Sequence, residues 1–285
     1  MPLSRRRFLA LGGGVVVLAA CGKSKSTSAG QGGGEFTEVA PGIVSIDLYA
    51  SPKPQRFAFA LTAKEGFASG APVRVAVAAP GETPDHFVPA SARGKGLPEF
   101  RGVYTIDATL DRPGIWHGVL DYQGDHRPFV FQVPAKPTSP IAGTAAPRAA
   151  SPTTTDTLGV DPICTRMPAC PLHTKSLADI VGKGKPVAVM FATPARCTSR
   201  YCGPVLDTML KLVPTYRDRI EFVHVEIYEN NETSDLISTV NAWGPLQGEP
   251  WLFGVDGRGV VTRRLDGAFD ETEIDALLAD LAKNA

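Results

Sequence analysis

Hydrophobic and polar positions alternate in the first half of the chain and follow longer periods in the second half. The alternating runs include Arg56–Leu61, Val73–Ala78, Gly102–Ala108, Gly114–Tyr122 and Phe129–Val133. Alternation of this kind predicts strands with one buried face, and the Pro-, Gly- and Asp-rich stretches between the runs predict turns. About seven such strands within about 100 residues favour an immunoglobulin-like β-sandwich over residues 35–134.

Residues 135–157 carry repeated prolines with Ala and Thr and almost no large apolar side chains. A segment of this composition buries too little apolar surface to fold alone and is typical of a semi-extended linker. The sequence therefore predicts two domains that move semi-independently, with the second domain spanning residues 158–285.

The second domain begins its predicted core with a short, β-branched apolar run, Val187–Phe191. Cys197 and Cys202 follow this strand, and Gly203 then opens a stretch of apolar residues at helical spacing. A thiol near a helix N-terminus lies beside free backbone N–H groups and the positive end of the helix dipole, so its thiolate is favoured. The thiolate is the form that attacks a disulfide. The pattern therefore predicts thiol–disulfide chemistry.

The triplet Cys202-Gly203-Pro204 resembles the start of the thioredoxin Cys-Gly-Pro-Cys site, although Val205 stands where the second cysteine belongs. Further along, Glu249-Pro250-Trp251 resembles the element that carries the cis-proline of that family. The resemblance covers roughly residues 177–285 and implies a thioredoxin-like α/β fold. It also implies catalytic roles for Cys197 and Cys202, here a Cys-x4-Cys variant, and for Pro250. Both cysteines remain candidates for the attacking thiol, and we favour Cys197.

Residues 1–21 have the pattern of an export signal. The basic stretch Ser4–Leu9 matches the twin-arginine type, and an apolar run too short to span a bilayer leads to a lipobox at Leu18–Gly22. The resemblance to bacterial lipoproteins implies lipidation of Cys21, with residues 22–34 as a flexible tether. We therefore expect an extracytoplasmic protein that is anchored to the bacterial cell membrane.

Charge excludes one class of partner. The 285 residues carry 29 Lys and Arg against 29 Asp and Glu, and the signal segment holds only basic charges, so the processed chain becomes mildly acidic. No clustered basic surface with interleaved aromatic residues is seen in the sequence, so we expect no nucleic-acid partner. The expected partners are exported protein substrates and a membrane redox partner.

The remaining cysteines, Cys164 and Cys170, precede the predicted core. With Cys21 lipidated, four cysteines allow three pairings in an exported protein. We expect Cys164–Cys170 to form a structural disulfide and Cys197–Cys202 to be the working pair. The loop closed by the first bridge is short, so its entropic stabilisation is modest.

A metal site is the alternative. Cys197 and Cys202 together with His173 and His224 offer soft ligands for Cu(I). Copper-delivery proteins of the Sco type also have a thioredoxin-like fold, with a cysteine pair and a distant histidine.

The sequence thus predicts a thiol–disulfide oxidoreductase that needs no cofactor. A Sco-like copper chaperone remains an alternative, as does a non-catalytic binding lipoprotein whose Cys197–Cys202 disulfide is structural.

Overall fold

A computed structural model describes residues 39–63, 66–68, 71–98, 102–197, 199–244, 246 and 248–283. The predicted signal segment, the lipidation site Cys21 and the tether lie outside these residues. The described residues belong to one compact unit.

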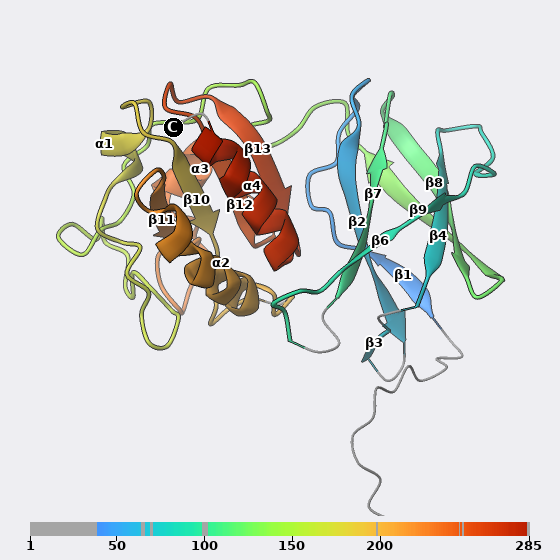
Figure 1. Cartoon of the computed structure of the whole chain (residues 1–285), viewed down its shortest axis with the longest axis horizontal. Helices are drawn as coiled ribbons and strands as arrows, with labels where there is room; N and C mark the ends of the chain where they lie inside the picture. The colour runs from blue at the N-terminus through green and yellow to red at the C-terminus, as the bar shows by residue number, and fades with distance from the viewer. Residues whose placement is uncertain are drawn as a thin grey trace, which may run out of the picture. The chain divides into compact units, whose positions relative to one another are not determined.

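Two antiparallel sheets make up the first half of this unit (Figure 1). The strands are β1 (Ala40–Ile43), β2 (Gln55–Ala63), β3 (Gly66–Ala68), β4 (Val73–Ala78), β5 (Val88–Pro89), β6 (Ser91–Arg93), β7 (Val103–Ala108), β8 (Gly114–Tyr122) and β9 (Asp125–Val133). One sheet has the order β1-β2-β7-β6, with β3 also paired to β2, and the other has the order β5-β4-β8-β9.

Alternating side chains build the core between the two sheets. On β8, Trp116 and Leu120 are buried while Ile115, on the opposite face, is half exposed. They pack in one cluster with Phe57 and Phe59 of β2. The five predicted strands are confirmed at their expected places, and the immunoglobulin-like assignment of the topology stays a prediction.

The second half has an α/β fold, as predicted. Its elements are α1 (Leu177–Ile180), β10 (Val187–Phe191), α2 (Cys202–Tyr216), β11 (Glu221–Val225), α3 (Ser238–Ala242), β12 (Trp251–Val255), β13 (Val261–Asp266) and α4 (Glu271–Lys283). The sheet order is β11-β10-β12-β13. Strands β10 and β11 are parallel, whereas β12 is antiparallel to both β10 and β13.

Both faces of this sheet are buried, which explains why β10 is apolar at every position. Ala188 and Met190 face a cluster that includes residues of α2 and α4. Val187, Val189 and Phe191 face a second cluster that includes residues of α1 and α3. The sheet is therefore a rigid platform, and the cysteine loop leaves it at the end of β10.

The segment predicted as a free linker is held along its length against the α/β half. The N–H of Ala146 donates to the carbonyl of Gly259 at 2.8 Å, and the N–H of Val261 donates to Thr144 at 2.9 Å. Small side chains allow this close approach, and the paired backbone groups make up for the few apolar contacts that the segment offers. The semi-independent motion expected of the two halves is therefore not supported.

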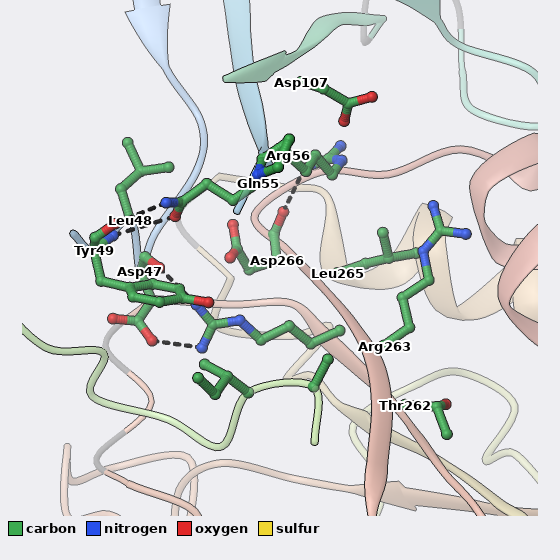
Figure 2. A pocket seen from close by; sticks show the side chains of 14 residues that line it. Asp47, Leu48, Tyr49, Gln55, Arg56, Asp107, Thr262, Arg263, Leu265 and Asp266 are labelled. Atoms are coloured by element: carbon green, nitrogen blue, oxygen red, sulfur yellow. Dashed lines mark hydrogen bonds and ion pairs between the residues drawn. The ribbon is translucent and has the colours of Figure 1, made fainter. Parts of the chain in front are cut away.

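Charged side chains join the two halves around a polar cleft of about 230 Å³. Figure 2 shows Asp47, Arg56 and Asp266 at this cleft. Arg56 pairs with Glu273 at 2.6 Å, and Asp47 pairs with Arg264 at 2.6 Å. Because these partners come from opposite halves of the chain, the cleft is best explained as a charge-matched junction.

Candidate functional site

The cysteine pair lies between the end of β10 and the start of α2. Cys197 and Cys202 are joined by a disulfide, with their Cα atoms 6.0 Å apart. Cys202 is the first residue of α2, and the loop carrying Cys197 turns back onto it through Arg200, whose φ is +60°. The predicted working pair is therefore brought together as a disulfide.

The two sulfurs have different surroundings. Cys202 is fully buried, whereas Cys197 is 8% exposed. Among the described residues, no side chain caps the start of α2 at Tyr201, and the N–H of Cys202 donates to the Sγ of Cys197 at 3.3 Å. The sulfur of Cys197 therefore occupies the place of a helix cap, where a thiolate is stabilised by the N–H groups and the helix dipole. When the disulfide is reduced, this arrangement would stabilise a thiolate at Cys197.

The expected cis-proline lies beside the disulfide. The Glu249–Pro250 bond is cis, as the resemblance implied. The Sγ of Cys197 lies 4.0 Å from the carbonyl oxygen of Glu249, and Ser199 donates a hydrogen bond to the same oxygen at 3.3 Å. Pro250 thus presents the backbone of its predecessor to the more accessible sulfur.

A buried carboxyl group completes the site, and sequence reasoning missed it. A carboxylate oxygen of Glu249 and the sulfurs of Cys197 and Cys202 all lie within 4.8 Å of one another. Burial raises the pKa of Glu249 to about 7, although its Oε2 accepts a hydrogen bond from the N–H of Thr193. The sequence feature that could have identified Glu249 is an acidic residue directly before a proline at the start of an apolar strand.

A second buried carboxyl group, Glu226, follows the end of β11. Burial raises its pKa to about 7 as well, and the N–H of Thr165 donates to its Oε1 at 2.6 Å. The charge of Glu226 contributes to the raised pKa of Glu249. The two acids therefore form an interacting pair, of which Glu249 is the one at the sulfurs.

Arg196, which directly precedes Cys197, makes its contacts with residues 228–234. Arg196 donates to the backbone carbonyls of Asn230 and Thr233, and its guanidinium lies 4.4 Å from the centre of the Tyr228 ring. Its role in the structure is to hold the 230–234 loop beside the cysteine loop. Through space, its charge partly offsets the raised pKa of Glu249.

The predicted structural disulfide between Cys164 and Cys170 is not formed in this structure. Both cysteines are free and buried, and they lie with His173 and His224. The two histidines are therefore grouped with the first cysteine pair, whereas the Cys197–Cys202 pair is grouped with Glu249. The sequence-based copper set, which joined Cys197 and Cys202 to these histidines, is not the arrangement observed.

A groove of about 350 Å³ opens next to the disulfide. Its lining near the site includes Ser199, Tyr201 and Glu249, and across from these it includes Ile43 and Ala60 of the first half. More apolar than polar surface lines the groove.

No family model matches this sequence, and no curated protein matches it. Among solved structures, the chain is similar to one described as a putative thiol:disulfide interchange protein DsbE from Chlorobium tepidum, with 18% sequence identity and a TM-score of 0.36. The similarity covers 50% of this chain and 99% of that chain. Within the described residues, no helix is long and apolar enough to cross a membrane.

The chain's own features support the thioredoxin-like resemblance at the level of the fold. They are the mixed α/β sheet, a strand that leads through a disulfide into a helix, and a cis peptide bond before Pro250, whose preceding carbonyl oxygen lies near the sulfur of Cys197.

Proposed function

We propose that this chain is a membrane-anchored, extracytoplasmic thiol–disulfide oxidoreductase that acts on protein disulfides through Cys197 and Cys202. The observation that carries the proposal is the asymmetry of the disulfide. One sulfur lies at a helix N-terminus next to an apolar groove, and the other is buried beside a carboxyl group whose pKa is about 7. The export signal and the lipobox in the sequence support the location.

The exchange proceeds in two displacements. The Cys197 thiolate attacks one sulfur of a substrate disulfide, forms a mixed disulfide and releases the other substrate sulfur as a thiolate. Cys202 then loses its proton to the Glu249 carboxylate and attacks the Sγ of Cys197, which releases the second substrate sulfur. The substrate gains two electrons and the enzyme becomes the disulfide seen here. A dithiol partner at the membrane restores the reduced form, and the same steps in reverse oxidise a substrate.

The apolar groove supports a polypeptide substrate. Protein disulfides are embedded in chain segments with side chains of mixed character, and an extended segment placed in the groove would lie beside Arg196 and Ser199 of the loop that carries Cys197. The carbonyl of Glu249 lies at the boundary of the groove and offers a backbone acceptor to such a segment.

Replacing Glu249 by Gln should remove a pH dependence. In the oxidised enzyme, protonated Glu249 supplies the proton that Cys202 takes up when a substrate thiolate attacks Cys197. Because the pKa of Glu249 is raised to about 7, this proton is available below pH 7 and is lost as the pH rises through that value. We expect Glu249→Gln to slow the reduction of the enzyme disulfide at low pH by about 10²-fold, the lower end of acid–base effects. Stopped-flow rates, expressed per substrate thiolate, would measure it.

Glu226→Gln is the matched control, because it removes the neighbouring acid but leaves the one at the sulfurs. The repulsion by Glu226 contributes to the raised pKa of Glu249. The pH profile of the reduction rate in this variant should therefore keep its inflection, shifted to lower pH. A Glu249→Gln profile that retains the wild-type inflection would exclude Glu249 as the proton donor.

Trapping of the mixed disulfide tests the proposal. A Cys202→Ser variant keeps the attacking thiol and loses the resolving one, so exported proteins should accumulate as covalent adducts that a reductant releases. Mass spectrometry of the adducts should locate the bond at Cys197. Adducts that form equally well in a Cys197→Ser, Cys202→Ser double variant would contradict the proposal.

A further inference from the structure

The first cysteine pair and two histidines form a cluster in the interior of the α/β half. Cys164, Cys170 and His173 come from the loop before α1, and His224 comes from β11. Their exposed fractions are 7%, 6%, 2% and 0%. Each side chain directs one ligand atom into the cluster, and these four atoms lie within 4.8 Å of one another.

Four distances between these atoms lie close to those of a tetrahedron of ligands around a metal ion. The Sγ of Cys170 lies 3.3 Å from the Nε2 of His173 and 3.4 Å from the Nδ1 of His224, and the two ring nitrogens are 3.1 Å apart. The Sγ of Cys164 lies 3.9 Å from the Nδ1 of His224. A tetrahedral Zn²⁺ with bonds of about 2.3 Å to sulfur and about 2.0 Å to nitrogen separates ligand atoms by about 3.3–3.8 Å.

The other nitrogen of His224 has a partner that orients the ring. The Nε2 of His224 lies 2.9 Å from the carbonyl oxygen of Ala192, which can only accept a hydrogen bond. The Nε2 therefore carries the proton, and the lone pair of Nδ1 is directed at the two sulfurs and His173. A ring nitrogen fixed by a backbone carbonyl on its far side is the usual support for a metal-binding histidine.

We propose that Cys164, Cys170, His173 and His224 bind a structural Zn²⁺ ion. Two thiolates and two neutral imidazoles complete a four-coordinate site with no position open to substrate, which is the form of structural rather than catalytic zinc sites. Binding releases the two thiol protons. The proposal is independent of the exchange reaction at Cys197 and Cys202, since it uses neither sulfur.

The site has a mechanical connection to the cysteine loop. The hydroxyl of Thr165, next to Cys164, accepts a hydrogen bond from the N–H of Ala195 at 3.1 Å, and it also contacts Glu226 at 3.0 Å. Ala195 lies two residues before Cys197. A metal that orders the Cys164–His173 loop therefore also supports the loop that carries the attacking thiol.

Metal analysis of the purified full chain tests the proposal. We expect one zinc ion per chain in the wild type and in a Cys197→Ser, Cys202→Ser double variant. Cys170→Ser and His224→Ala should lose the zinc. Cobalt taken up in place of zinc should show the intense visible bands of tetrahedral Co²⁺ and a sulfur-to-cobalt charge-transfer band. In the double variant this band would come from Cys164 and Cys170, because these are the cysteines that remain in residues 158–285.

Measurements on the wild type keep the test valid if the ligand variants do not fold. A strong chelator should lower the melting temperature, and added Zn²⁺ should restore it. A wild-type chain that contains no zinc, takes up no Co²⁺ and shows a Cys164–Cys170 disulfide by peptide mapping would overturn the proposal, as would a chain that holds only copper. A wild-type chain that holds zinc but catalyses no disulfide exchange would count against the proposed function alone.

Discussion

Replacing Cys197 by Ser should abolish turnover. The reduction of insulin disulfides by the purified chain, measured in the presence of a dithiol, should fall below detection. The hydroxyl of serine does not ionise near neutral pH, so it cannot act as the nucleophile that the thiolate provides. Cys197 retains 8% exposure, whereas Cys202 is fully buried and cannot replace it.

The structure also predicts what this variant should leave intact. Serine differs from cysteine only in the oxygen that replaces the sulfur, so Cys197→Ser should fit the same buried position and keep the circular dichroism spectrum and a cooperative thermal transition. Wild-type turnover in the variant would exclude Cys197 as the nucleophile. Cys202→Ser separates the two steps, because it should also lose turnover while its Cys197 thiol still reacts with an alkylating agent.

The second large effect is expected at the junction between the two halves, where Asp47 pairs with Arg264. The carboxylate of Asp47 accepts hydrogen bonds from the N–H groups of Thr138 and Ser139 as well as from the guanidinium. Asp47 is 5% exposed, and the Arg264 side chain is 12% exposed. Asp47→Ala leaves a buried cation and two N–H groups without their acceptor, and should lower the free energy of unfolding by about 3–5 kcal/mol. Urea denaturation would measure the loss.

Two comparisons make this prediction specific. Asp125→Ala removes the partner of Arg127 in an exposed pair, where the Asp125 side chain is 72% exposed, and should change the stability by less than about 1 kcal/mol. The Asp47→Ala, Arg264→Met double variant also lacks the buried cation. Its loss in free energy of unfolding should therefore be smaller than the sum of the losses in the two single variants. Equal effects of Asp47→Ala and Asp125→Ala would contradict the view of the polar cleft as a buried junction.

Local patterns were sufficient to predict the strands and the Cys197–Cys202 disulfide. Alternation in Gly114–Tyr122 and the continuous apolar run Val187–Phe191 each reflect how many faces of a strand are buried, which is a property of neighbouring residues. The placement of Cys202 at a helix start follows from Gly203 and the apolar spacing after it. These predictions depend on short stretches of chain, and the structure confirms them.

The predictions from sequence failed for groups that are distant in sequence and come together only in the folded chain. Cys164 and Cys170 suggested a disulfide because they are close in sequence, and nothing local shows that the adjacent strand β11 directs His224 at both of them. Likewise, Glu249 was noticed only as the residue before a proline, because its burial depends on the packing of the cysteine loop over it. The composition of the linker predicted a free segment. Composition does not show that the backbone groups of this segment form hydrogen bonds with residues at the start of β13.

The reduction potential of the Cys197–Cys202 pair tests the proposed function most directly. Alkylation of free thiols across a series of redox buffers, followed by mass spectrometry, would measure it. An exchange catalyst predicts a value between about −120 and −270 mV, the range of known thiol–disulfide oxidoreductases. A value well below about −300 mV is typical of structural disulfides. That result would contradict the proposed exchange reaction and favour a binding lipoprotein.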